Sequence, residues 1–182
     1  MLSEEQRTSI TAVFASLDAT HDGLISRDDA TMRANQVCAA VAPDEASESH
    51  RDIQTAYGRL WEELMRYADA EGDGTLTLDE FLDAVDRGML EDPEFVEGCM
   101  LVVSHAVFAA ADRDGDGSIS REEYALAVTS IDEKNAELAD AGFAMMDRDG
   151  DGLISRDELL QAIRDAFSSS EPAEGFGARV FR

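Results

Sequence analysis

Positively charged side chains are scarce in this sequence. It contains 15 Lys and Arg residues against 40 Asp and Glu residues, which gives a formal net charge of −25. A surface with this charge repels DNA, RNA and anionic membranes, because all three are negatively charged themselves. We therefore expect neither a nucleic-acid partner nor a membrane partner.

Long apolar runs and cysteines are also few. No stretch approaches the roughly 18 consecutive apolar residues of a membrane-spanning helix. The first residues lack the basic start and apolar run of a secretory signal, so we expect a cytoplasmic protein. The two cysteines, Cys38 and Cys99, are too few for a disulfide scaffold. We expect both to be reduced, partly buried thiols.

Common catalytic motifs are missing as well. The sequence has no H-E-x-x-H, no G-x-S-x-G and no G-x-x-x-x-G-K, so we do not expect an enzyme. His105 lies among apolar residues and is interpreted as an interior or half-buried histidine instead of a catalytic base. Trp61, the one tryptophan, is expected in the core.

The acids that dominate the composition are clustered in loops. Residues 112–123 and 147–158 both match the pattern D-x-[DN]-x-[DN]-G-x5-E, which binds calcium. Calcium takes roughly six to eight oxygen ligands, and acids at positions one, three and five supply one side of that shell. Glycine at position six allows the sharp turn, and glutamate at position twelve closes the shell with both oxygens.

The positions between the acids predict further features of these two loops. Position eight is Ile119 or Ile154, and a β-branched residue there favours a short strand that pairs neighbouring loops. Position nine is Ser120 or Ser155, which can hold a coordinating water. We therefore expect the loops to lie side by side.

Residues 18–29 form a related loop with two departures. Thr20 at position three is a weaker ligand than an acid, and Asp29 at position twelve is one methylene shorter than glutamate. A shorter acid reaches the ion less easily with both oxygens, which lowers the coordination number and favours six-coordinate magnesium. Magnesium binding at this first site is a hypothesis.

Residues 69–80 form the remaining loop. Its acids at positions one, five and twelve and its glycine at position six are intact, but Glu71 occupies position three. The longer side chain must fold back or displace its neighbours there. Metal binding at this second site is left open, and about three to four calcium ions are expected in total.

Helical periodicity flanks every loop, which makes a fourfold helix–loop–helix repeat. An apolar residue precedes the first acid of each loop by four positions: Phe14, Met65, Phe108 and Phe143. We expect helices over residues 30–41 and 51–68, among others. The uneven loop spacing favours one compact body over two lobes on a free linker. Residues 1–90 and 91–167 are predicted as the two paired halves.

Residues 168–182 are predicted as a tail. It begins like a flexible linker and ends with Phe176, Val180 and Phe181. These three side chains could dock between the helices of the second half, or the terminus could be frayed. The sequence leaves both alternatives open.

These loops and their spacing resemble the sarcoplasmic calcium-binding proteins and their bacterial relatives, the calerythrins. The resemblance covers residues 3–167 and implies an all-α protein of four EF-hands, arranged in two pairs with short β-bridges between paired loops. It implies these ligands, with the seventh position of each loop using its backbone carbonyl: Asp18, Thr20, Asp22, Leu24, Ser26 and Asp29; Asp69, Glu71, Asp73, Thr75, Thr77 and Glu80; Asp112, Asp114, Asp116, Ser118, Ser120 and Glu123; Asp147, Asp149, Asp151, Leu153, Ser155 and Glu158.

Similar loop spacing occurs in calcium-triggered photoproteins and luciferin-binding proteins, which enclose an aromatic substrate with His, Trp and Tyr clusters. Three His, one Trp and three Tyr are too few for that constellation. The resemblance implies a protein that chiefly binds calcium. Our first hypothesis is an intracellular calcium buffer or store, because the uneven loop spacing argues against freely hinged lobes. A calcium sensor that exposes a hydrophobic surface to a protein partner is the alternative. The methionines that such a surface uses are scattered here, so no protein partner is indicated and we expect a monomer.

Overall fold

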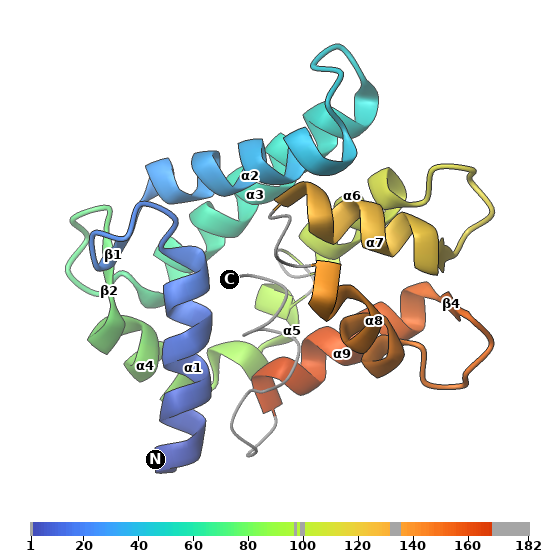
Figure 1. Cartoon of the computed structure of the whole chain (residues 1–182). Helices are drawn as coiled ribbons and strands as arrows, with labels where there is room; N and C mark the ends of the chain where they lie inside the picture. Colours follow the sequence, from blue (N-terminus) through green and yellow to red (C-terminus); the bar gives the residue numbers. More distant parts are fainter. Residues whose placement is uncertain (1, 97, 99–100, 132–135, 169–182) are drawn as a thin grey trace.

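The computed structural model describes residues 2–96, 98, 101–131 and 136–168. These residues form helices joined by loops, with two small antiparallel sheets (Figure 1). The first half contains α1 (Glu4–Leu17), β1 (Leu24–Ile25), α2 (Arg27–Val41), α3 (Glu48–Ala68), β2 (Leu76–Thr77) and α4 (Leu78–Asp86). The second contains α6 (Leu101–Ala111), β3 (Ile119–Ser120), α7 (Arg121–Ile131), α8 (Ala136–Met146), β4 (Leu153–Ile154) and α9 (Arg156–Ser168). The all-α, four-EF-hand prediction is confirmed.

Side-chain caps determine where several helices begin. Ser3 and Gln6 form a capping box at the start of α1, in which the Ser3 N–H donates to Gln6 Oε1 at 2.9 Å and the Gln6 N–H donates to Ser3 Oγ at 3.1 Å. Ser26 caps α2, which therefore begins at Arg27 and not at residue 30 as predicted. Ser47 caps α3, because its Oγ accepts the His50 N–H at 3.1 Å. The predicted start of that helix at residue 51 was also too late.

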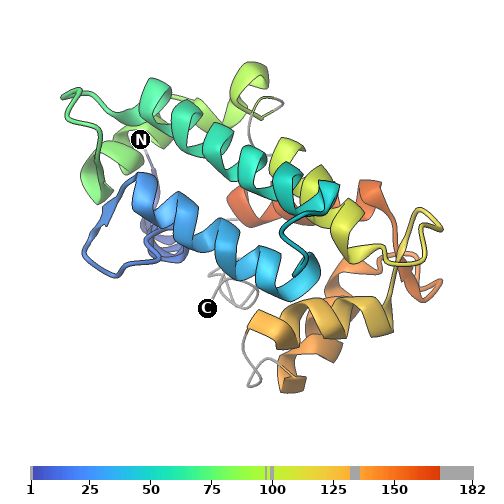
Figure 2. The same ribbon diagram turned by 90° about the horizontal axis from the view of Figure 1, so that it is seen from above.

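Each sheet joins the loops of one pair. Ile25 lies opposite Leu76 in the first sheet, and Ile119 lies opposite Ile154 in the second. All four are position-eight residues, and all are buried. The predicted pairing of loops through position eight is therefore confirmed, and it places the two pairs of loops at opposite ends of the molecule (Figures 1 and 2).

Three clusters of buried side chains hold the helices together. The first contains Phe14, Leu64 and Phe81 within the first half, and the second contains Phe108, Phe143 and Ile154 within the second half. The third joins the halves, because it brings together α2, α3 and α6: Ala34, Val37, Cys38, Ala42, Ile53, Tyr57 and Ala110. Helix α2 also packs on α7 and α3 packs on α6. This shared core confirms the compact body predicted from the loop spacing.

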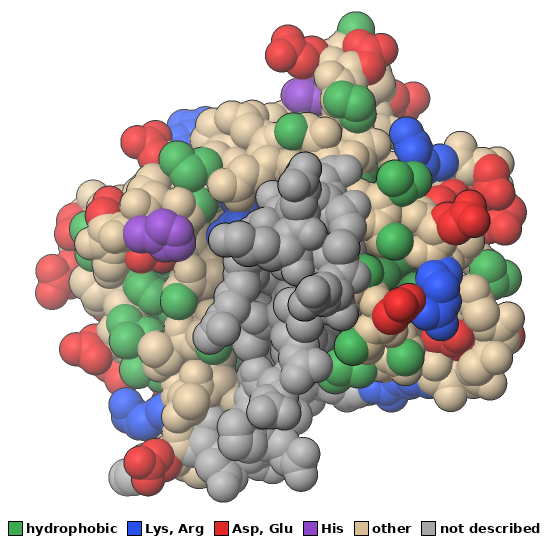
Figure 3. Space-filling model, viewed as in Figure 1, with side chains coloured by type: hydrophobic (Ala, Val, Ile, Leu, Met, Phe, Trp, Pro, Cys, Tyr) green, Lys and Arg blue, Asp and Glu red, His purple; other side chains and the backbone are tan. Residues whose placement is uncertain are grey.

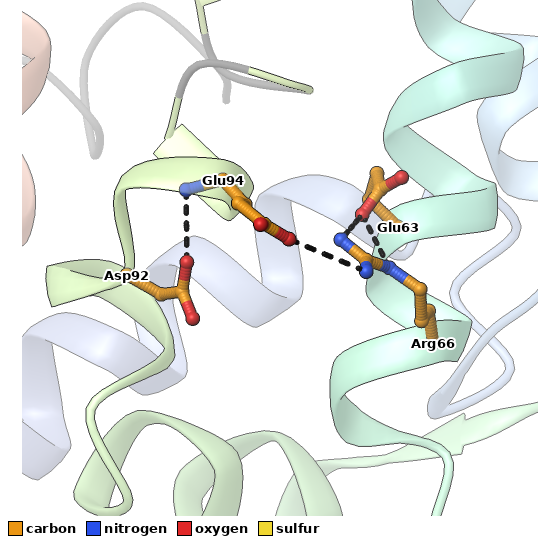
Figure 4. A network of polar contacts seen from close by, with 4 residues as sticks. All are labelled: Glu63, Arg66, Asp92 and Glu94. Carbon is orange, nitrogen blue, oxygen red and sulfur yellow. Dashed lines mark hydrogen bonds and ion pairs between the residues drawn. The ribbon is translucent and has the colours of Figure 1, made fainter.

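The joint between the halves is itself packed. A 3-10 helix η1 (Met89–Glu91) and a short helix α5 (Pro93–Phe95) follow α4. Phe95 is buried, and the centre of its ring lies 5.2 Å from the centre of the Tyr67 ring in α3. Figure 4 shows Arg66 of α3 paired with Glu63 (2.5 Å) and reaching toward Glu94 of α5 (3.7 Å). The division proposed after residue 90 falls inside η1 and remains a proposal.

Two side chains lie elsewhere than predicted. His105 is exposed, because the buried face of α6 runs through Ser104, Phe108 and Ala111. Trp61 is half-buried and packs under the Arg27 guanidinium, 5.4 Å from the ring centre, outside the core clusters. Both interpretations as interior residues were wrong.

Other predictions can be assessed only in part. Cys38 is buried and free, as predicted. Cys99 and the proposed docking residues Phe176, Val180 and Phe181 lie outside the described residues. Among the helices described, none has the length and apolar character needed to cross a membrane.

Two helical glycines differ in what surrounds them, which gives a matched prediction. Nothing lies within 4 Å of a Cβ built on exposed Gly58 of α3, whereas a Cβ on Gly142 of α8 would collide with the Tyr124 hydroxyl oxygen. Gly58→Ala should stabilise the protein by about 0.5–1 kcal/mol through helix propensity. Gly142→Ala should destabilise it by about 1–3 kcal/mol through overpacking.

Urea unfolding of the two single variants in calcium-free buffer measures both effects. Each substitution is glycine to alanine within a helix, so each serves as the control for the other. Changes of the same sign would show that helix propensity, and not the Tyr124 contact, governs both positions.

Candidate metal centres

The four loops share one internal hydrogen-bond pattern. In each loop the glycine at position six donates its N–H to Oδ2 of the position-one acid, at 2.9 to 3.1 Å: Gly23 to Asp18, Gly74 to Asp69, Gly117 to Asp112 and Gly152 to Asp147. The position-seven N–H donates to Oδ1 of the position-five acid at 2.8 to 2.9 Å: Leu24 to Asp22, Thr75 to Asp73, Ser118 to Asp116 and Leu153 to Asp151. The loops therefore curl around their acids in the same way.

The position-twelve acid ties each loop to its exit helix. It accepts hydrogen bonds at 2.7 to 3.0 Å from both the backbone N–H and the hydroxyl of position nine: Ser26 to Asp29, Thr77 to Glu80, Ser120 to Glu123 and Ser155 to Glu158. The position-nine residue is thus the helix cap. Its predicted role in holding a metal-bound water remains a prediction.

The third loop gathers three of its acids. Carboxylate oxygens of Asp112, Asp114 and Glu123 all lie within 4.8 Å of one another. Glu123 accepts hydrogen bonds from Ser120 with Oε2, and its other oxygen, Oε1, accepts the Arg113 N–H at 2.7 Å. Like charges at this separation repel unless a cation lies between them, so the arrangement fits a divalent ion.

The fourth loop gathers Asp147, Asp149 and Asp151, again within 4.8 Å of one another. Oδ1 of Asp147 is buried and accepts no hydrogen bond. A buried carboxylate oxygen without a partner is costly, and a calcium ion would supply the missing partner. The donor set, all oxygen, is the one that calcium prefers.

The second loop keeps only part of this arrangement. Glu80 Oε1 is buried without a well-aligned hydrogen bond, although the N–H groups of Ala70 and Glu71 lie near enough to affect its pKa. Glu71 is exposed, and no convergent set of acids is found in this loop among the described residues. The departure noted at position three therefore coincides with a looser group of acids.

The first loop is closed around its shorter acid. Asp29 is fully buried, with Oδ1 accepting the Thr20 N–H at 2.9 Å and Oδ2 accepting both hydrogen bonds from Ser26. Burial raises the pKa of Asp29, but these hydrogen bonds together lower it below its ordinary value. Asp18 is also buried. No convergent group of three acids is found in this loop within the described chain.

Each loop has two residues with a positive φ, one at position six and one at position four. We did not predict the one at position four. Position four has a φ of 60° to 74°: His21, Gly72, Gly115 and Gly150. Glycine tolerates this conformation, while His21 adopts it with a side chain. The signal was available, because three of the four loops have glycine at position four in addition to position six.

Acidic side chains lie around the loops at both ends of the molecule on the face in Figure 3, and a further group lies at the top of the view, over the connection between α2 and α3. In the third and fourth loops the fold brings carboxylates together, and an ion bound between them would offset their repulsion.

The fold and the loops agree with comparisons to known proteins. A family model described as an EF-hand domain pair matches residues 102–164, and a second model with the same description matches residues 62–88. Calerythrin of Saccharopolyspora erythraea is 29% identical over 125 residues, covering 68% of this chain and 71% of calerythrin. The β chain of a sarcoplasmic calcium-binding protein of Penaeus is 29% identical over 112 residues, or 60% of this chain and 58% of that one.

A solved structure is also similar over most of its length. It is a calcium-binding protein of Streptomyces coelicolor, with a TM-score of 0.77 and 28% identity, and the match covers 90% of this chain and 98% of the other. The repeated helix–loop–helix units and paired loops, with these matches, identify the chain as an EF-hand calcium-binding protein. Its similarity is to calerythrin and the sarcoplasmic calcium-binding proteins.

The position-twelve acids predict how the calcium-free protein responds to acid. Hydrogen bonds from Ser120 lower the pKa of Glu123 below its ordinary 4.5, and hydrogen bonds from Ser155 do the same for Glu158. Because the folded pKa is the lower one, the stabilisation is present above the unfolded pKa and is lost as the pH falls through the folded value. Glu123→Gln with Glu158→Gln should therefore reduce the loss of stability below about pH 4.5.

Urea unfolding between pH 3 and 7 in calcium-free buffer measures this slope. Glu122→Gln with Asp157→Asn is the control, because it removes one charge from the first turn of α7 and one from that of α9 and leaves these hydrogen bonds in place. Equal acid slopes for the wild type and the double variant would contradict the role given to the two glutamates.

Proposed function

We propose that this chain is an intracellular calcium buffer or store. The third and fourth loops would bind calcium through their acids at positions one, three, five and twelve, with the position-seven carbonyl completing the shell. The convergent carboxylates of these loops and the partnerless Asp147 Oδ1 support this assignment. The first and second loops would bind more weakly, through the corresponding positions from Asp18 to Asp29 and from Asp69 to Glu80.

The core shared between the halves is the observation that favours buffering. Helix α2 packs on α3 and α7, and Cys38, Ile53 and Ala110 are buried where the halves meet. A sensor opens its helix pairs to expose a groove, which here would separate side chains that already form one core. Calcium would therefore change occupancy with little change in exposed apolar surface. The buried free Cys38 is compatible with a reducing compartment.

A calcium sensor is the second candidate, and one comparison favours it. The similar Streptomyces coelicolor structure is described in terms of prokaryotic calcium-mediated regulation. Three large apolar side chains, Met32, Leu126 and Met145, are 40 to 49% exposed. They lie one each on α2, α7 and α8, and α7 packs against both of the other helices.

The two candidates differ in what calcium does to exposed apolar surface. For a buffer we expect no calcium-dependent retention on a phenyl resin and a nearly unchanged radius of gyration. We also expect a higher melting temperature, because calcium binds the native state only. X-ray scattering and thermal unfolding with calcium and with chelator measure these quantities.

Calmodulin, which exposes apolar grooves when it binds calcium, is the positive control for the resin. Strong retention of this chain only in calcium would reject buffering in favour of sensing. An unchanged melting temperature would instead reject calcium binding itself.

We also propose that the first loop prefers magnesium more than the others do. Asp29 is one methylene shorter than glutamate, and both its oxygens are held by Thr20 and Ser26. Asp29→Glu should lengthen the reach to the ion and raise calcium affinity relative to magnesium by about tenfold, on the scale by which EF-hand loops are tuned. Calorimetric titrations with each metal test this, with Glu123→Asp as the reciprocal variant. Unchanged selectivity in Asp29→Glu would count against the proposal.

A further inference from the structure

The second pair of EF-hands contains two reciprocal contacts between an arginine and a phenylalanine. Cζ of Arg121, the first residue of α7, lies 4.7 Å from the ring centre of Phe143 in α8. Cζ of Arg156, the first residue of α9, lies 5.2 Å from the ring centre of Phe108 in α6. Both distances are within the range of a cation–π interaction. We call this pair of contacts the arginine clasp.

The clasp follows the symmetry of the two hands. Arg121 and Arg156 both occupy position ten of their loops, and Phe143 and Phe108 both precede the first acid of a loop by four residues. Each arginine contacts the phenylalanine of the other hand. The exit helix of each hand is therefore joined to the entering helix of its partner.

The backbone carbonyl of each phenylalanine accepts a hydrogen bond from the first acid of its own loop. Asp147 donates its N–H to the Phe143 carbonyl at 2.9 Å, and Asp112 donates its N–H to the Phe108 carbonyl at 2.9 Å. The phenylalanine side chains are at most 1% exposed and belong to one core cluster. A shift of either ring would therefore be passed to the start of the corresponding loop.

Each arginine lies close to the last acid of its own loop. Arg121 and Glu123 are in the first turn of α7, where Ser120 holds the Glu123 carboxylate at 2.7 and 2.8 Å. Arg156 and Glu158 have the same relation in α9. An ion bound by the position-twelve glutamate fixes this turn, and the arginine is fixed with it.

We propose that the arginine clasp couples the two hands, so that calcium in one loop favours calcium in the other. Each route runs from the last acid of one loop to the first acid of the other loop: Glu123, Arg121, Phe143 and Asp147; Glu158, Arg156, Phe108 and Asp112. Arg121 and Arg156 are positioning residues and not ligands. The inference rests on the proposed ligands of these two loops and adds to the β3–β4 pairing as a second connection.

The first pair of hands contains one related contact, but its aromatic residue, Trp61, precedes Asp69 by eight residues and not by four. Arg27 at position ten of the first loop lies over Trp61 at 5.4 Å. Leu78 occupies position ten of the second loop and carries no charge. The coupling between the first and second loops should therefore be weaker than that between the third and fourth.

The full chain carries its own reporters for each loop. The Gly117 N–H donates to Asp112 and the Gly152 N–H donates to Asp147, so their amide NMR signals report on the third and fourth loops separately. A calcium titration followed at both signals shows whether the two loops fill together. The ratio of the second binding constant to the first then measures the coupling.

The test compares the wild type with Arg121→Leu, Arg156→Leu and the double variant. Each contact should contribute roughly two- to fivefold, so the double variant should lower this ratio by about four- to 25-fold. Half-filled pairs should become visible. Arg121→Lys with Arg156→Lys keeps a cation over each ring and should restore part of the coupling.

Two control variants separate the clasp from other effects of charge. Arg113→Leu removes the same charge from the exposed second position of the third loop, and the backbone N–H that binds Glu123 stays. Asp140→Asn removes the ion pair that Arg121 makes at 2.6 Å and leaves the ring contact. Both should keep the wild-type ratio.

A double-mutant cycle of Arg121→Leu with Phe143→Leu, measured by urea unfolding without calcium, gives a readout independent of metal. We expect non-additive losses. Additive losses, an unchanged binding ratio in the double arginine variant, an equal loss in Arg113→Leu, or a wild type whose loops fill independently would each overturn the clasp. If the Gly117 and Gly152 signals of the wild type do not respond to calcium, the ligand assignment on which the clasp rests would be overturned instead.

Discussion

The position-twelve carboxylate connects metal binding to the fold. In every loop it accepts hydrogen bonds from position nine, which caps the exit helix, as Ser120 does for Glu123 at 2.8 Å. The same carboxylate is the proposed final ligand of the ion. Because one group serves both purposes, the exit helix begins where the ion-binding loop ends, and any change at the ion reaches the first turn of that helix. The clasp arginines lie in that turn in the second pair.

Packing between the halves limits how far such a change can spread. The core around Cys38, Ile53 and Ala110 fixes α2 and α3 against α6, and the buried Phe95 anchors the joint to the first half. Local tightening of a loop is thus compatible with a nearly constant outer shape. This combination, adjustable loops on a fixed core, is what the proposed buffering function requires.

Much of the fold could be predicted from the sequence because the ion imposes its own spacing. Acids at alternate positions, glycine at six and an apolar residue at eight predict four loops and their pairing, and the structure confirms the pairing at Ile25 and Ile119. The early start of α2 was missed because Ser26 was interpreted as a ligand position, whereas its hydroxyl also caps the helix. A residue with two roles cannot be assigned from spacing alone.

The remaining errors come from tertiary contacts. Helix α6 is apolar on nearly every side, so its periodicity could not show that His105 faces outward. Trp61 is covered by Arg27 from another helix, which no local pattern indicates. The arginine at position ten repeats in three loops, but its partner is known only once the hands are placed together. The third and fourth loops match the calcium-binding pattern without departures, and their acids converge in the structure. Their assignment as ligands remains a prediction.

The central claim is that the acids of the third and fourth loops enclose calcium. Equilibrium dialysis of chelator-stripped protein against radioactive calcium at neutral pH and physiological salt tests it most directly. The account predicts that about two ions per chain are retained at micromolar free calcium, with any further ions bound more weakly. A chain that retains no calcium under these conditions would contradict it.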